Sequence, residues 1–162
     1  MPAAPALRLA RAADAPAIAA LSRDRIEHGL GWRWTAPRVL RSIADHDTNA
    51  VVAAEGSRVL GFGLMTYQDD EAHLLLLAVR ADASRRGIGA ALVTWLERSA
   101  RVAGLGQVRL ESRLANDAAR AFYARLGYRE IQTLPGYYLG REACVRLAKD
   151  LWLAPVEPGQ PG

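Results

Sequence analysis

Two glycines at the start of a predicted helix are the first residues whose type and spacing could do chemistry. Gly87 and Gly89 follow an apolar run at Leu74–Val79, and a helical apolar repeat begins directly after them. The first turn of a helix leaves backbone N–H groups free, and its dipole places positive charge there. Because glycine lacks a Cβ atom, the backbone can turn tightly and approach a phosphate. This spacing predicts an anion site between a strand and a helix.

The elements that must position this site follow from apolar periodicity and turn residues. Helices are expected to begin after Asp14, Thr35, Gly87 and Asn116. Strands are expected at Arg8–Ala10, Ala50–Ala54, Arg58–Tyr67, Glu71–Val79, Gln107–Ser112, Tyr128–Thr133 and Ala143–Leu147. Hairpins followed by strand–helix–strand–helix–strand predict an α/β (mixed α+β) protein with helices on both faces of one mixed sheet.

Length and composition are typical of a globular domain. The chain has 162 residues, of which 51% are hydrophobic and 23% charged. It contains no apolar window of about 18 residues, and its first residues do not resemble a signal peptide. We therefore expect a cytoplasmic protein without a membrane partner. A single domain is expected over residues 1–153, followed by a flexible tail rich in proline and glycine over residues 154–162.

Charge and cysteine content argue against two other classes of protein. The net charge of +4 comes from scattered arginines and a single lysine, Lys149, without the concentrated basic patch that nucleic-acid binding requires. The only cysteine, Cys144, lies in a strand pattern and is expected to be a buried thiol. No Cys/His spacing suits zinc. We expect neither a nucleic-acid partner nor a metal.

Two sequence blocks resemble the GNAT superfamily of N-acetyltransferases. The first joins Leu77-Ala78-Val79 to the run RRGIGA at Arg85–Ala90, and the second is NDAARAFYARLGY at Asn116–Tyr128. Element order extends the resemblance over roughly Leu7 to Leu151, and the motifs are most similar to those of bacterial ribosomal-protein alanine N-acetyltransferases. The resemblance implies a mostly antiparallel, twisted sheet of six to seven strands with a splayed parallel pair and helices on both faces.

The resemblance also implies acetyl-CoA as cosubstrate and an amine as acceptor, with direct transfer between them. In relatives the strand that ends in Leu-Ala-Val pairs with the pantetheine arm, and a backbone N–H there polarises the thioester carbonyl. Ser84 departs from the Gln or Arg usual at its position. The cofactor-binding residues implied are Leu77, Ala78, Val79, Arg85, Arg86, Gly87, Ile88, Gly89, Ala90, Asn116 and Tyr123.

Asn116 and Tyr123 lie two turns apart along one helix face. Attack of an amine on a thioester expels a thiolate, which benefits from a proton donor. A phenol with a pKa of about 10 can supply that proton at neutral pH. We assign Tyr123 as general acid, the alternative being a packed aromatic, and Asn116 as a cofactor contact that can also cap its helix.

Two residues compete for the role of the base that takes a proton from the amine. Glu111 lies in Leu-Glu-x-Arg-x-x-Asn, which resembles the pattern in which the alanine N-acetyltransferases carry their base. Alternation places Glu111 level with Arg109 and Arg113, so a surface charge ladder is the other interpretation. His73 is the second candidate, because a histidine with a pKa of about 6.5 accepts protons near neutrality. A water chain from either residue is a further alternative.

Acceptor residues are expected on two variable loops. These are the aromatic residues Trp32, Trp34, Tyr137 and Tyr138, although any of them could belong to the core. The expected acceptor is a protein or peptide N-terminus, with a small-molecule amine as the alternative. Glu142-Ala143 lacks the Asp that this branch often has there. A non-catalytic acyl-CoA-binding domain remains an alternative. The sequence leaves the oligomeric state open, a homodimer being one option because such families commonly form dimers.

Overall fold

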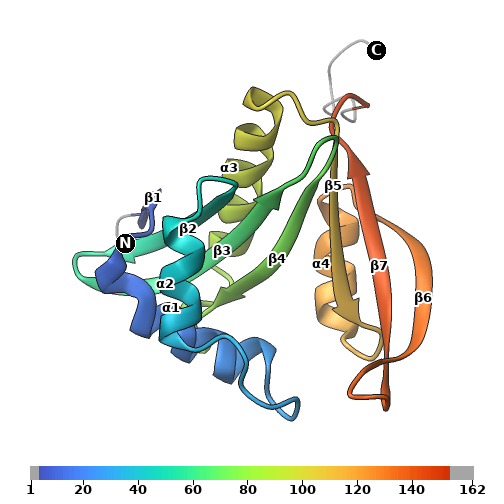
Figure 1. The fold of residues 1–162 in the computed structure, drawn as a ribbon, viewed down its shortest axis with the longest axis horizontal. Helices are drawn as coiled ribbons and strands as arrows, with labels where there is room; N and C mark the ends of the chain where they lie inside the picture. The colour runs from blue at the N-terminus through green and yellow to red at the C-terminus, as the bar shows by residue number, and fades with distance from the viewer. Residues whose placement is uncertain (1–3, 154–162) are drawn as a thin grey trace.

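The computed structural model describes residues 4–153, and its strands form one seven-stranded sheet (Figure 1). The strands are β1 Ala6–Leu9, β2 Thr48–Glu55, β3 Arg58–Tyr67, β4 Ala72–Val79, β5 Gln107–Arg113, β6 Arg129–Tyr138 and β7 Glu142–Asp150. Their order is β1-β2-β3-β4-β5-β7-β6, and only β4 and β5 run parallel. The predicted mixed and mostly antiparallel sheet is confirmed.

The sheet splits between its two parallel strands. Pairing between β4 and β5 covers only Ala72 with Val108 and His73 with Arg109, after which the strands diverge (Figure 1). On its other edge β4 stays paired with β3 as far as Val79. The backbone of β4 beyond His73 therefore borders a wedge instead of a neighbouring strand.

A bulge in β4 lies where this wedge begins. Met65 of β3 pairs with Leu74 and Leu64 pairs with Leu76, which leaves Leu75 as an extra residue. Such an insertion shifts the alternation of side chains by one position and bends the strand. It turns the backbone of β4 at the point where β5 leaves.

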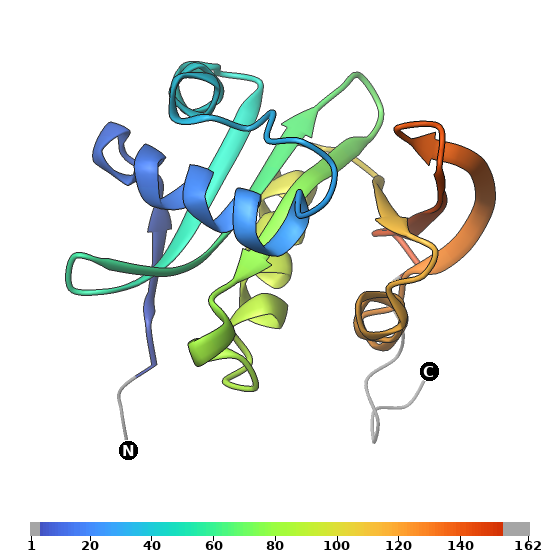
Figure 2. The ribbon, with the colours of Figure 1, turned by 90° about the horizontal axis from the view of Figure 1, so that it is seen from below.

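Helices cover both faces of the sheet (Figure 2). They are α1 Ala15–Leu21, which continues as a π-helical turn at Ser22–Ile26, α2 Ala36–Ala44, α3 Ile88–Val102 and α4 Asp117–Arg125, with single 3-10 turns at Ala12–Asp14 and Ala81–Ala83. None of the helices in the described range 4–153 has the length and apolarity needed to cross a bilayer.

Each face of the sheet has its own apolar core. Ile18 of α1 and Val39 of α2 pack with Phe62 of β3 on one face. Leu92 and Leu96 of α3 pack on the other face in a cluster that extends to Tyr123 of α4 and Leu147 of β7. These side chains are almost fully buried, so the helices that flank the wedge are anchored on both sides of it.

The observed elements differ from the predicted ones in three places. Asp14 does not cap α1 with its side chain, because its carboxylate accepts hydrogen bonds from the Arg8 guanidinium and the Arg11 backbone N–H. Strand β6 continues through Pro135, which an edge strand tolerates because the sheet does not need its missing N–H. The π-helical turn after α1 was not predicted, because such a turn has no simple residue signature. The predicted tail, residues 154–162, lies outside the described residues.

Candidate active site

The turn before α3 has two residues in the left-handed backbone region. Arg85 has φ of 66° and Gly87 has φ of 75°. A left-handed conformation is uncommon for a residue with a side chain, and such outliers concentrate at binding sites. Residues of alternating hand around a helix N-terminus turn their N–H groups inward to form an anion-binding concavity. This backbone geometry is compatible with the anion site predicted for the turn, which stays a prediction.

The two glycines of the turn serve different purposes. A Cβ atom at Gly87 would meet nothing within 4 Å, so this position requires glycine for its backbone angle. A Cβ atom at Gly89 would lie 3.2 Å from the Phe122 ring, so Gly89 lets α3 and α4 approach. Beside them, the Arg86 guanidinium donates to Glu55 at 2.9 Å, and Ser84 Oγ donates to the carbonyl of Ala81.

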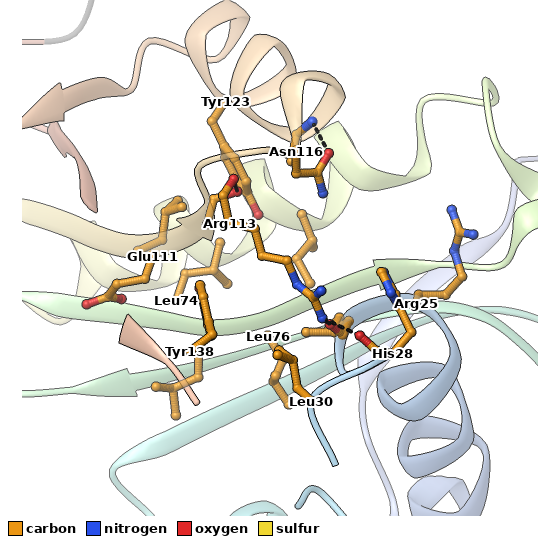
Figure 3. A pocket seen from close by; sticks show the side chains of 16 residues that line it. Arg25, His28, Leu30, Leu74, Leu76, Glu111, Arg113, Asn116, Tyr123 and Tyr138 are labelled. Atoms are coloured by element: carbon orange, nitrogen blue, oxygen red, sulfur yellow. Dashed lines mark hydrogen bonds between the residues drawn. The ribbon is translucent and has the colours of Figure 1, made fainter. Parts of the chain in front are cut away.

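A cavity of about 140 Å³ lies in the wedge between β4 and β5 (Figure 3). Its walls come from the backbone and side chains of β4, from the end of β5, from α4 and from the segment after α1. The lining residues are Arg25, Ile26, His28, Leu30, Leu74–Leu77, Leu110–Arg113, Asn116, Ala119, Tyr123 and Tyr138. Of the predicted Leu-Ala-Val residues, Leu77 lines the cavity, whereas Ala78 and Val79 continue the strand toward the turn.

Tyr123 reaches into this cavity from α4 (Figure 3). Its ring packs edge-on against Phe122 and Tyr128, and the residue is 8% exposed. Burial raises the pKa of Tyr123 above the ordinary value for a phenol, because desolvation disfavours the phenolate. The hydroxyl therefore remains protonated at neutral pH, as a proton donor must.

Asn116 caps the helix that carries Tyr123. Its side-chain oxygen accepts a hydrogen bond from the N–H of Ala119 at 3.1 Å. Asn116 also lines the cavity, so one residue both starts α4 and borders the wedge. Gly127, with φ of 94°, ends the same helix as predicted.

The two candidate bases are bonded to each other. His73 Nε2 and Glu111 Oε2 are 2.5 Å apart, and Arg146 Nε donates to Glu111 Oε1 at 3.2 Å. The Glu111 side chain is 9% exposed and that of His73 is 16% exposed. Glu111 is thus a partly buried, paired carboxylate and not part of a solvated surface charge ladder. The expected alignment of Glu111 with Arg109 and Arg113 on one side of β5 is confirmed by the burial alternation.

The contact with Arg109 indicates which nitrogen of the His73 imidazole carries the proton. Arg109 Nη2 lies 3.3 Å from His73 Nδ1, and a guanidinium can only donate. Nδ1 therefore accepts this hydrogen bond, which leaves the proton on Nε2 to be donated to Glu111. This arrangement makes Glu111 the proton acceptor of the pair and His73 the residue that orients it.

The surroundings of Glu111 hold it in the ionised form. Burial on its own would raise the pKa of Glu111, but the hydrogen bond from His73 and the charges of Arg109 and Arg146 outweigh burial. The net result is a pKa below the ordinary value for a glutamate.

Of the four aromatic residues predicted for the acceptor loops, Tyr138 lines the cavity and the other three do not. Tyr138 packs edge-on against Tyr137, which is 49% exposed. Trp32 donates its indole N–H to the carbonyl of Ala19, and Trp34 packs partly against the α1–α2 core beneath Arg38. Neither tryptophan lines the cavity, because both side chains turn back onto the helices they connect.

Several cavity residues had no signal in the sequence. Arg25, His28 and Leu30 lie in the segment between α1 and α2, where irregular backbone gives no periodicity. Arg113 belongs to the Leu-Glu-x-Arg-x-x-Asn pattern, but its partners cannot be found from that pattern alone. Cys144 is a fully buried free thiol, as predicted, and burial raises its pKa.

Known proteins are similar to this chain in sequence. An uncharacterized N-acetyltransferase of Methanocaldococcus jannaschii is 36% identical over 99 residues, which cover 60% of this chain and 64% of that protein. The ribosomal protein bS18-alanine N-acetyltransferase of Escherichia coli is 33% identical over 97 residues, 58% of this chain and 66% of the enzyme. The matched region thus spans slightly less than two thirds of these relatives.

Solved structures extend the likeness to the whole fold. A crystal structure of the Escherichia coli ribosomal-protein alanine N-acetyltransferase matches with a TM-score of 0.78 at 24% identity, covering 97% of this chain and 99% of that one. The PaiA N-acetyltransferase of Thermoplasma acidophilum, in complex with coenzyme A, gives 0.75 at 18% identity, covering 90% and 98%. The model of the Acetyltransferase (GNAT) family matches residues 16–128, the region that holds the turn, the wedge and Tyr123. The chain therefore belongs to the Acetyltransferase (GNAT) family.

Proposed function

We propose that this protein transfers an acetyl group from acetyl-CoA directly to the α-amine of a protein or peptide N-terminus. The observation that carries the proposal is the wedge, because it joins an unpaired edge of β4, a phenol and a paired carboxylate in one cavity. Family membership and the names of the relatives support N-acetyltransferase chemistry.

Acetyl-CoA fits the residues present on the cofactor side of the wedge. The left-handed Arg85 and Gly87 make a concavity suited to the pyrophosphate, and the free edge of β4 from Leu74 to Val79 offers N–H and C=O groups to the pantetheine amides. When bound, the cosubstrate supplies the acyl thioester. A backbone N–H of β4 near the bulge stabilises negative charge on its carbonyl oxygen.

Tyr123 supplies a proton to the departing thiolate in this proposal. Its raised pKa keeps the phenol protonated, and a coenzyme A thiolate left in the cavity without a proton donor would be costly. Asn116 and Gly127, which begin and end α4, hold the phenol in place. Loss of the hydroxyl would remove the donor without disturbing the ring contacts.

Glu111 acts as the base, and an α-ammonium is easier for a carboxylate base to deprotonate than a lysine ammonium. An α-ammonium has a pKa of about 7.7–8.0, whereas a lysine side chain has about 10.4. The difference adds roughly 3 kcal/mol to proton removal by the same carboxylate. Glu111, which His73, Arg109 and Arg146 hold ionised, therefore suits the more acidic ammonium group.

A small-molecule amine is the second candidate acceptor, and thiol release from acetyl-CoA distinguishes the two. Peptides with a free N-terminus should react, and the same peptides with a blocked N-terminus should not. Aliphatic polyamines and aminoglycosides should be much poorer acceptors. Tight coenzyme A binding without turnover on any amine would instead indicate a non-catalytic acyl-CoA-binding domain.

A further inference from the structure

Arg113 connects β5 to the segment that follows α1, across the wedge. Its Nη2 donates to the carbonyl oxygens of Ile26 at 2.8 Å and His28 at 2.7 Å (Figure 3). The side chain is 16% exposed; the bond to Ile26 is partly buried, whereas the bond to His28 is exposed. The two carbonyls are 87 and 85 residues away in the sequence, and they belong to the opposite wall of the cavity.

The same guanidinium reaches the end of the β6–β7 hairpin. Arg113 Nη1 lies 3.4 Å from the Glu142 carboxylate, and Cζ lies 5.9 Å from the centre of the Tyr138 ring. One side chain from β5 therefore contacts two further walls of the cavity. The 26–28 segment precedes the predicted acceptor residues Trp32 and Trp34, and Tyr138 is itself a predicted acceptor residue. We call the 26–28 segment and the Tyr138 end of the hairpin the two acceptor walls.

The segment that Arg113 holds is braced from within by a buried carboxylate. Glu27 accepts hydrogen bonds from Ser22 Oγ at 2.8 Å, from the Arg33 N–H at 2.7 Å and from the Trp34 N–H at 3.2 Å. Residues 22–34 are thus tied into one unit. Loss of the bond to Arg113 would therefore make this whole unit more mobile, not only the residues that Arg113 contacts.

We infer that Arg113 is a positioning residue that sets the acceptor wall of the cavity. It fixes the distance between the 26–28 segment and β5, and so the width available to the acceptor chain. Within residues 4–153, its contacts reach both acceptor walls but not the Arg85–Gly89 turn. Loss of Arg113 should therefore lower kcat/KM for the acceptor while leaving acetyl-CoA binding intact. The inference rests on the proposed function for its kinetic consequence only.

Kinetics of Arg113→Gln and Arg113→Lys test this role. We expect kcat/KM for a peptide acceptor to fall about 10- to 100-fold in Arg113→Gln, as for the loss of charged hydrogen bonds, with KM for acetyl-CoA unchanged. Arg113→Lys should recover part of the loss, because an ammonium can donate to both carbonyls. Arg8→Gln is the matched control, since Arg8 is also half-buried and donates to a carboxylate and a carbonyl, at the far edge of the sheet.

Hydrogen exchange on the full-length protein gives a readout that does not depend on turnover. Backbone amides of residues 28–34 should exchange faster in Arg113→Gln and not in Arg8→Gln. If no amine is acetylated by the wild type, the proposed function fails, and exchange alone still decides whether Arg113 holds the segment. Unchanged exchange would overturn the inference. So would equal losses for acetyl-CoA and acceptor, or faster exchange with an unchanged acceptor kcat/KM.

Discussion

The two sides of the wedge are built in different ways. The side that we propose for the cofactor consists of backbone features close together in the sequence, namely the left-handed turn at Arg85–Gly87 and the unpaired edge of β4. The side that we propose for the acceptor contains contacts over long sequence distances, such as Arg113 with Ile26 and His73 with Glu111. Backbone sites accept the same ligand whatever side chains vary around them. Side-chain sites can change their acceptor with a few substitutions.

The largest effect is expected where both sides meet, at Tyr123. Tyr123→Phe should lower kcat about 10²- to 10⁴-fold, because the proton donor is lost while the ring contacts with Phe122 and Tyr128 remain. KM for acetyl-CoA should change little. Tyr67→Phe is the control, as Tyr67 bonds Asn49 and Ser99 away from the cavity. Full activity of Tyr123→Phe in steady-state thiol release would remove Tyr123 from this role.

A smaller loss, about 10²-fold in kcat/KM, is expected for Glu111→Gln. His73→Leu should instead raise the pKa of Glu111, because the hydrogen bond that lowers it is removed while burial persists. The acid limb of the kcat/KM profile should then move to higher pH. A pH profile of His73→Leu that coincides with the wild type would show that the pair does not control proton transfer.

Backbone strain introduced at Gly87 should affect acetyl-CoA binding, whereas the same strain elsewhere should not. Gly87→Ala should cost on the order of 1 kcal/mol in stability and raise KM for acetyl-CoA, since alanine disfavours φ of 75°. Gly104→Ala carries similar strain at φ of 85° after α3, with open space around it. It should lose similar stability in urea unfolding without a change in either KM. Equal kinetic effects of both variants would argue against an anion site at the turn.

The smallest effect is expected in the pH dependence of stability. Since folding lowers the pKa of Glu111, the stabilisation is present above its unfolded pKa of about 4.3 and is lost as pH falls through the folded value. Glu111→Gln should therefore lose less stability than the wild type between pH 7 and pH 3. Urea midpoints at the two pH values measure this, and parallel losses would contradict the prediction.

The same contrast explains how much of the molecule could be predicted from its sequence. The turn at Gly87, the cap at Asn116 and the phenol at Tyr123 are local patterns, because each depends on residues within one or two helical turns. The mixed sheet follows from the order of apolar runs, although the bulge at Leu75 does not. Local patterns therefore predicted the cofactor side.

The acceptor side could not be predicted, because its contacts are set by tertiary structure. Glu111 and His73 were competing candidates for one role, and only the parallel pairing of β4 and β5 brings them into contact. The sequence places Trp32 and Trp34 in a loop where they could contact an acceptor. In the structure, Trp32 donates a hydrogen bond to α1 and Trp34 packs on the core. The π-helical turn that carries Arg25 toward the cavity has no simple residue signature.

In the proposed reaction, the cavity acetylates an α-amine by using Tyr123 and the Glu111–His73 pair. The most direct test of this reaction is mass-spectrometric mapping of the product from a peptide that carries both a free N-terminus and an internal lysine, incubated with acetyl-CoA near pH 7.5. We expect acetylation at the α-amine, strongly reduced in Tyr123→Phe and in Glu111→Gln. Acetylation at the lysine ε-amine, or α-acetylation that survives both substitutions, would contradict the account.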